Sequence, residues 1–106
     1  AKVSCDEVFG PVVCVYPFEK PEEAVKRANA LPVCFQSAVF TRDIDRAFYY
    51  VRNLQATAVM VNDHTAFRVD WMPFGGRMQS GLGMGGIPRT MEDMTTEKMF
   101  VVRTTS

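Results

Sequence analysis

The order of apolar and amphipathic segments limits the folds open to this chain more than any other feature. Residues 11–18 form a near-continuous apolar run rich in valine, which is typical of a strand buried on both faces. Further apolar runs follow at residues 37–41 and 56–63, and helical patterns separate the three runs. The order strand, helix, strand, helix, strand predicts an α/β fold with right-handed crossovers and a parallel sheet.

The two helical segments carry sequence signals at their ends. Residues 21–31 start with Pro21, which suits the first helical turn, and place acidic residues before basic ones, as the helix dipole favours. Between residues 43 and 54 apolar side chains repeat at helical spacing, and Asp43 or Asp45 is available to cap the start. Both segments are therefore predicted to be helices.

The pattern changes after the third apolar run. Residues 63–87 have no sustained period, but they contain glycine-rich pieces and several large apolar side chains. A connection of this length is usually functional or disordered, and disordered segments are poor in aromatic residues. We therefore predict an ordered loop over a pocket. A short helix at 88–97 and a final strand at 98–104 follow it.

Three glycines in this loop formally match the GxGxxG pattern of dinucleotide-binding proteins. Gly81, Gly83 and Gly86 have the right spacing, but the pattern binds pyrophosphate only where it joins a strand to a helix. Here the glycines end an irregular loop and follow no predicted strand, and Pro88 removes one N–H from the next helix. We interpret them as positions where the backbone turns and packs closely.

Charge and composition exclude several classes of partner. The 106 residues suffice for one domain or one piece of a larger one, and 12 basic residues balance 12 acidic ones. Without a basic stripe or a long apolar run, we expect no nucleic acid and no membrane as partner. Cys5, Cys14 and Cys34 form no CxxC pair, so we expect reduced thiols, no metal site and a cytoplasmic location. Cys14 and Cys34 are interpreted as small buried hydrophobic residues.

Several motifs, in order, resemble the aldehyde dehydrogenase superfamily. Residues 7–11 match its ExFGP segment, and the chain continues with AVFTRDIDRA, AVMVND, MPFGGRMQSGLG and MEDMTTEK. The resemblance covers almost the whole chain. It implies a three-layer α/β fold with a mostly parallel sheet and flanking helices. Residues 1–95 correspond to the C-terminal part of the catalytic domain, and residues 96–106 to the terminal strand of the bridging and oligomerisation region.

The same resemblance implies a function for the longer enzyme. Members of the superfamily oxidise an aldehyde to a carboxylic acid with NAD or NADP, through a cysteine thiohemiacetal and thioester. Their nucleophile and dinucleotide-binding domain lie upstream of the ExFGP segment. We therefore expect this chain to hold no catalytic residue and to be inactive alone. It is expected to work with the upstream part of the same enzyme, in a homodimer or homotetramer.

Site residues follow from the matched motifs. Glu7 matches the glutamate that hydrogen-bonds the nicotinamide ribose, and Phe9 matches an aromatic at the nicotinamide end. Phe74 matches an aromatic at the aldehyde entrance, and Phe67 is a second candidate there. Arg68 is a candidate partner for an anionic substrate group, because its guanidinium presents a planar fork of donors. For these residues, a solvated side chain or plain core packing is the alternative.

One stretch of the chain departs from the family sequence, and one alternative function stays open. Cys34 and Phe35 lie in a stretch where many superfamily members have Tyr-Gly, a departure that touches none of the assigned residues. A non-catalytic module that binds a small molecule or oligomerises is the alternative function, since fold alone does not exclude it. The aldehyde itself and the choice between NAD and NADP are left open by the sequence.

Overall fold

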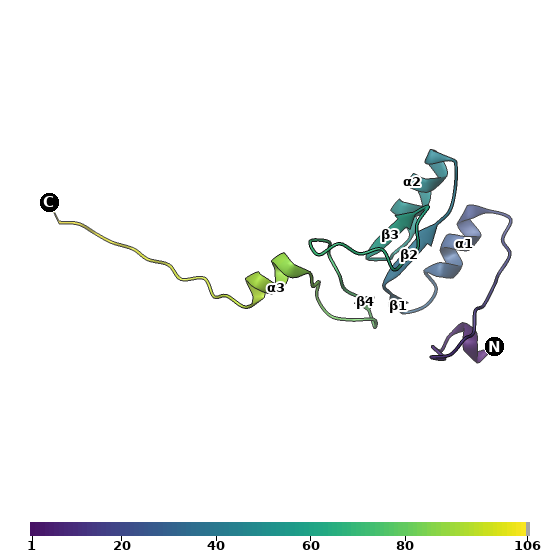
Figure 1. Ribbon diagram of the computed structural model, residues 1–106, viewed down its shortest axis with the longest axis horizontal. Coiled ribbons are helices and arrows are strands. Elements are labelled where there is room, and N and C mark those ends of the chain that lie inside the picture. Colours follow the sequence, from purple (N-terminus) through teal and green to yellow (C-terminus); the bar gives the residue numbers. More distant parts are fainter. Residues whose placement is uncertain (106) are drawn as a thin grey trace.

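The computed structural model describes residues 1–105, which form three α-helices, a short 3-10 helix and two small sheets (Figure 1). In chain order the elements are η1 (Lys2–Ser4), α1 (Pro21–Ala28), β1 (Val33–Cys34), β2 (Gln36–Val39), α2 (Ile44–Asn53), β3 (Ala58–Val61), β4 (Arg77–Met78) and α3 (Ile87–Asp93).

The β2–α2–β3 unit is the regular part of the fold. β2 and β3 pair in parallel, from Gln36 opposite Ala58 to Val39 opposite Val61. Parallel neighbours need a crossover connection, which α2 supplies. This unit confirms the two predicted strands, the helix between them and their parallel arrangement.

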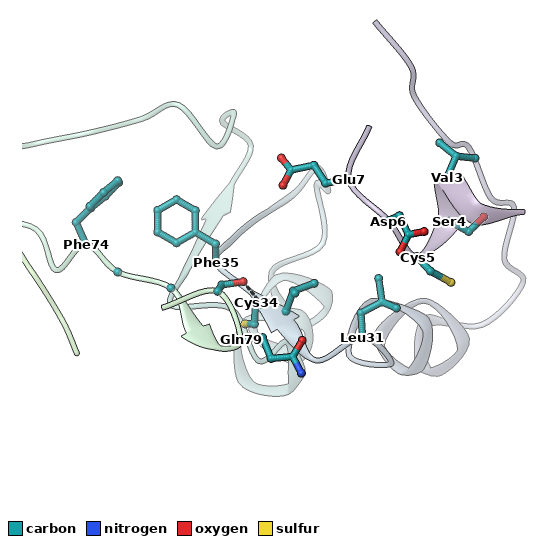
Figure 2. Close-up of a pocket in the computed structure, with 14 residues that line it drawn as sticks. Val3, Ser4, Cys5, Asp6, Glu7, Leu31, Cys34, Phe35, Phe74 and Gln79 are labelled. Carbon is teal, nitrogen blue, oxygen red and sulfur yellow. Dashed lines mark hydrogen bonds between the residues drawn. The ribbon is translucent and has the colours of Figure 1, made fainter. Parts of the chain in front are cut away.

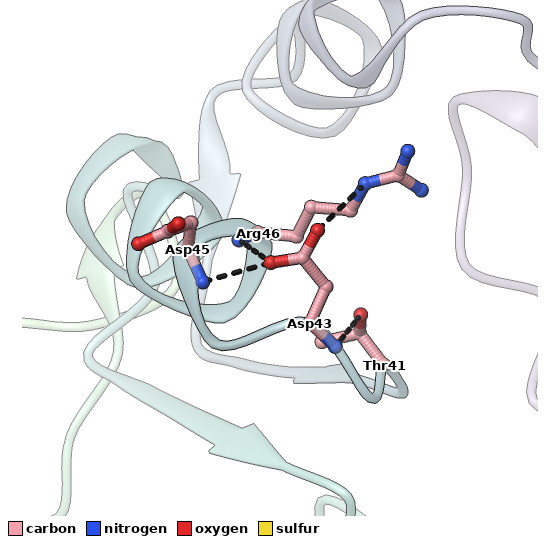
Figure 3. Close-up of polar contacts among 4 residues, drawn as sticks. All are labelled: Thr41, Asp43, Asp45 and Arg46. Carbon is pink, nitrogen blue, oxygen red and sulfur yellow. Dashed lines mark hydrogen bonds and ion pairs between the residues drawn. The ribbon is translucent and has the colours of Figure 1, made fainter.

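Local side-chain chemistry explains where α2 begins. The Asp43 carboxylate accepts hydrogen bonds from the backbone N–H groups of Asp45 at 2.9 Å and Arg46 at 3.2 Å (Figure 3). Asp43 itself is held by the Thr41 hydroxyl, which accepts its N–H at 3.1 Å. Of the two predicted capping residues, Asp43 is therefore the cap. The Arg46 side chain also lies 3.5 Å from Asp43, but both groups are exposed, so this ion pair contributes little.

The core includes residues of α1, α2 and β3, and the two helices pack against each other. One residue from each of these elements is buried, namely Val25, Ala47 and Met60. Asn29, directly after α1, joins the helix ends, because its amide donates to the Asn53 carbonyl at 2.8 Å and accepts the Gln55 N–H at 3.1 Å. The predicted first helix is confirmed, although it ends at Ala28 rather than Leu31.

Asn62 closes the ends of the parallel strands. Its backbone N–H donates to the Val39 carbonyl at 2.8 Å, continuing the ladder by one residue. Its side chain accepts the Thr41 N–H at 2.8 Å and donates to the Thr41 carbonyl at 2.9 Å. The residue has φ 59°, in the left-handed region that Asn tolerates better than most residues. The long loop that follows thus starts from a fixed point.

The loop after β3 is ordered, as predicted, but it also contains a strand. β4 pairs antiparallel with β1, with Cys34 opposite Arg77. The hydroxyl of Ser80 accepts the Cys34 N–H at 2.9 Å, and the N–H of Gln79 donates to the Pro32 carbonyl, also at 2.9 Å. These bonds bring the loop back against the segment before β2.

The loop glycines turn the chain and allow close packing, as the sequence interpretation proposed. Gly83 has φ 73°, and a Cβ on Gly75 would lie 2.8 Å from the Gly83 carbonyl oxygen. The expectation that the glycines follow no strand is wrong, because β4 directly precedes them. Yet β4 is a two-residue antiparallel strand, and not the parallel strand of a dinucleotide-binding unit.

Three further expectations are corrected. Residues 11–18 and 98–104 form no strand within residues 1–105, since each runs extended without a neighbouring strand. An apolar run records the tendency to be buried, but a strand also needs a partner for its backbone groups. The last predicted helix ends at Asp93 and not at residue 97. After it, the N–H and the hydroxyl of Thr95 both donate to the Glu92 carbonyl. Ser106 of the predicted bridging region lies outside the described residues.

The molecule is elongated. Its extents are 76 × 33 × 22 Å, and the two termini lie at opposite ends of the longest axis (Figure 1). The radius of gyration is 19.9 Å, whereas a compact domain of this size has about 13 Å. Within residues 1–105, no helix has the length and apolar character needed to cross a membrane.

The cap of α2 can be tested by substitution. Replacing Asp43 with Ala removes the acceptor of two N–H groups and should cost about 1 kcal/mol. Amide exchange within α2 should then accelerate roughly fivefold, measured by hydrogen exchange in the full-length protein that contains this chain. The Asp43→Ser variant keeps a capping oxygen and should exchange nearly as slowly as the wild type. Equal acceleration in both variants would contradict the cap.

The clamp at Asn62 predicts an order of stabilities. Asn62→Gly loses the two side-chain hydrogen bonds but tolerates φ 59°. Asn62→Ala loses the same bonds and also places a Cβ in the left-handed region, at a further cost of about 1 kcal/mol. Urea midpoints of the full-length protein should fall in the order wild type, Gly variant, Ala variant. An Ala variant as stable as the Gly variant would show that the backbone angle carries no strain.

Candidate functional site

A hollow of about 810 Å³ lies between distant segments of the chain (Figure 2). Three segments that are distant in the sequence line it: the N-terminal turn at residues 3–7, the segment 31–35 around β1, and parts of the loop at 74–80. The pairing of β1 with β4 holds the second and third segments together. Sequence reasoning predicted that the long loop covers a pocket, and this hollow confirms it.

Glu7 lies on this hollow. Its segment follows the short helix η1, where the N–H groups of Cys5 and Asp6 both donate to the Lys2 carbonyl at 2.8 Å. In Figure 2 its carboxylate points toward the side of the hollow formed by Phe35 and Phe74. The side chain is exposed, so its oxygens are accessible to a ligand.

Phe74 lies on the same hollow as Glu7, although it belongs to the distant loop after β3. Its backbone forms a bridge with Gly85, in which each residue's N–H donates to the other's carbonyl, at 3.1 and 2.7 Å. The Arg68 guanidinium carbon lies 4.2 Å from the centre of the Phe74 ring. Two of the predicted site residues therefore share one hollow, and a third is attached to it through Phe74.

The other two predicted site residues lie elsewhere. Phe9 is 92% exposed and lies on a smaller hollow of about 350 Å³ formed by residues 3–14. Its φ of 48° is unusual for a bulky side chain. Phe67 lies with Met60 and Met72 on a separate hollow of about 340 Å³ beside β3. Glu7 also lines the smaller hollow and so shares it with Phe9, but neither Phe9 nor Phe67 lines the 810 Å³ hollow.

His64, a second side chain near Arg68 in the sequence that could pair with an anion, is engaged locally. Its ring Nδ1 accepts the Ala66 N–H at 3.1 Å, and its Nε2 lies 3.9 Å from the Asp63 carboxylate. Asp63 in turn accepts the His64 N–H at 2.8 Å. These contacts shape the start of the loop. Of the two candidates, Arg68 is the one that stacks on a residue of the hollow.

The cysteines differ in their surroundings. Cys34 is partly buried, lines the hollow and directs its thiol to the Gln55 carbonyl. Cys14 is exposed, which corrects the expectation that it is a buried hydrophobic residue, because the apolar segment around it has no cover within the described chain. Among residues 1–105, no group of three or more His, Cys, Asp or Glu side chains is arranged to hold a metal ion.

Phe35 and Ser80 are among the residues of the hollow that sequence reasoning did not predict. The Phe35 ring meets Phe74 edge to face, with centroids 5.0 Å apart and planes at 84°. Ser80 accepts the Cys34 N–H and so ties the loop to β1. The departure at Cys34–Phe35 was the available signal for Phe35. A lone serine in a glycine-rich loop gives no comparable signal.

Comparison with known proteins places this geometry in context. The model of the aldehyde dehydrogenase family matches residues 1–100. Among curated relatives, lactaldehyde dehydrogenase from Methanococcus aeolicus is 39% identical over 98 residues, covering 92% of this chain and 21% of that protein. The chain therefore spans about a fifth of the length of such relatives.

Two solved structures are similar in both sequence and fold. Aldehyde dehydrogenase 21 from Physcomitrella patens, in complex with the reaction product succinate, is 40% identical with a TM-score of 0.78, over 85% of this chain and 19% of that one. NADP-dependent glyceraldehyde-3-phosphate dehydrogenase from Bacillus halodurans C-125, complexed with NADP, is 34% identical with a TM-score of 0.85, over 92% of this chain and 20% of that one. These likenesses confirm the α/β fold. The chain belongs to the aldehyde dehydrogenase family.

Proposed function

We propose that this chain is the C-terminal part of an NAD(P)-dependent aldehyde dehydrogenase that oxidises an aldehyde to a carboxylic acid. The observation that supports this best is the shared hollow of Glu7 and Phe74, which belong to two separate family motifs. In this proposal, Glu7 binds the cofactor and Phe74 lines the path of the aldehyde. The cysteine nucleophile and the dinucleotide-binding domain lie in the rest of the enzyme, so the chain alone is inactive.

The exposed residues of the N-terminal segment fit a cofactor. The ionised carboxylate of Glu7 can accept hydrogen bonds from two ribose hydroxyls, which orients the nicotinamide ring. Phe9 presents a flat ring that limits movement of the nicotinamide end. Its backbone lies in the left-handed region, and such strained conformations cluster at binding sites. When bound, NAD or NADP supplies the acceptor of the hydride.

The loop residues fit an aldehyde that carries an anionic group. Because the guanidinium lies over the Phe74 ring, its in-plane N–H groups stay free for a carboxylate or phosphate. The succinate bound to the Physcomitrella enzyme and the phosphorylated substrate named for the Bacillus enzyme are both anionic. We assign Arg68 to the anionic group and Phe74 to the wall of the entrance, and Phe67, on the separate hollow beside β3, is a second candidate for that wall.

The exposed apolar segments fit a chain that packs against more protein. Val13 and Val15 are each 85% exposed, and Met99 and Phe100 are 87% and 84% exposed. Exposed apolar surface of this kind marks an interface. We propose that residues 11–18 and 98–104 pair with strands outside this chain, completing a three-layer, mostly parallel sheet. Residues 1–95 then belong to the catalytic domain and residues 96–106 to the bridging region of a cytoplasmic homodimer or homotetramer.

The role of Glu7 can be tested in the full-length enzyme. Glu7→Gln removes the charge of the acceptor and should raise the dissociation constant of NAD or NADP on the order of tenfold, while slowing hydride transfer. Fluorescence titration and single-turnover absorbance measure the two effects. Glu19→Gln makes the same charge change outside the hollow and should behave like the wild type. If both variants match the wild type, Glu7 does not bind the cofactor.

The role of Arg68 predicts a change in substrate preference. Arg68→Gln should raise the KM for succinic semialdehyde or glyceraldehyde 3-phosphate, whichever the enzyme oxidises, on the order of tenfold or more. The neutral counterparts butanal and glyceraldehyde should be affected less than twofold. Arg52→Gln is the matched control, because Arg52 also lies over a phenylalanine, Phe48 on α2, at 5.7 Å. Equal losses with charged and neutral aldehydes would rule out anion binding by Arg68.

A further inference from the structure

The aromatic pair of Phe35 and Phe74 connects the rigid part of the fold to the candidate substrate loop. Phe35 occupies the single position between β1 and β2, so one neighbour pairs with β4 and the other with β3. Its carbonyl accepts the Thr57 N–H at 2.8 Å, which adds a third attachment. The backbone that carries the Phe35 ring is therefore held by both sheets.

Phe74 is held less firmly. It lies in the long loop, and its backbone is fixed by the isolated bridge to Gly85. Its ring is contacted edge to face by Phe35, with centroids at 5.0 Å, and carries the Arg68 guanidinium at 4.2 Å. The Phe74 ring and the guanidinium above it thus depend on the Phe35 ring for their orientation.

We propose that Phe35 is a specificity-determining positioning residue, which orients Phe74 and, through it, the Arg68 guanidinium toward the anionic group of the aldehyde. This inference rests on the proposed role of Arg68. Phe35 also lines the same hollow as Glu7 and Phe74, so its ring lies close enough to orient Phe74 there.

The physical basis is the geometry of the stack. An edge-to-face aromatic pair favours a defined ring orientation, and a cation over a ring loses attraction when the ring turns. Without the Phe35 ring, Phe74 can rotate in the hollow and the guanidinium loses its fixed support. Binding of the anionic group should weaken, while the reaction of the bound aldehyde should continue at an unchanged rate.

The test is a double-mutant cycle in the full-length enzyme. Phe35→Leu, Arg68→Gln and the double variant are compared with the wild type, using the better oxidised of succinic semialdehyde and glyceraldehyde 3-phosphate beside butanal or glyceraldehyde. Phe35→Tyr keeps the ring and serves as the rescue variant. Phe48→Leu removes a ring that also lies under an arginine but lines none of the hollows described above.

Phe35→Leu is expected to raise the KM for the anionic aldehyde on the order of fivefold. The kcat and the KM for the neutral aldehyde should each stay within about twofold of the wild type. Phe35→Tyr and Phe48→Leu should match the wild type. In the double variant, the loss should equal that of Arg68→Gln alone, because both substitutions remove the same interaction. If the Leu variant does not fold, Phe35→Met replaces the ring with an unbranched, adaptable apolar side chain and undergoes the same cycle.

The outcomes separate the two proposals. The role of Phe35 is overturned, and that of Arg68 stands, if Arg68→Gln raises the KM for the anionic aldehyde but loss of the Phe35 ring does not. The same conclusion follows if the effects of the two substitutions on this KM add fully in the double variant. A fall in kcat with both aldehydes would likewise make Phe35 a general packing residue. If the wild type oxidises neither anionic aldehyde, or if Arg68→Gln has no effect on it, the proposed function of Arg68 fails and this inference with it.

Discussion

The antiparallel pairing of Cys34 with Arg77 joins parts of the chain that would otherwise be independent. One partner precedes the parallel β2–β3 unit and the other lies in the long loop after it. Because the pairing is short, the bonds of Pro32 and Cys34 to Gln79 and Ser80 support it. Without it, the loop carrying Phe74 would have no fixed position against β1, and two walls of the hollow would separate.

Elements with local signals could be predicted from the sequence, whereas elements that depend on distant partners could not. α2 has a cap at Asp43 and apolar residues at helical spacing, so its bounds follow from neighbours in sequence. β1 and β4 have two residues each, too few for any alternation to show. The opposite holds for residues 11–18, where the apolar pattern is present but no strand lies beside it among residues 1–105.

The candidate site shows the same division. The roles of Glu7 and Phe74 came from family motifs, and no pattern in the residues alone would place these two side chains on one hollow. The structure supplies that fact through the β1–β4 pairing. Phe35 was visible in the sequence only as a departure. Its importance depends on a ring contact with Phe74, which lies far from it in the chain.

The charges of Glu7, on the hollow, and of Arg68, beside Phe74, suggest how an anionic aldehyde would be oriented under the proposed function. Glu7 places a carboxylate on the N-terminal side, whereas Arg68 places a guanidinium beside Phe74. An anionic group is repelled by the first and attracted by the second, so the aldehyde end is directed toward the cofactor side. Both groups are accessible to water, so this steering should weaken as salt rises. Orientation then depends on hydrogen bonds to the guanidinium, whose position the stack of Phe35 and Phe74 determines.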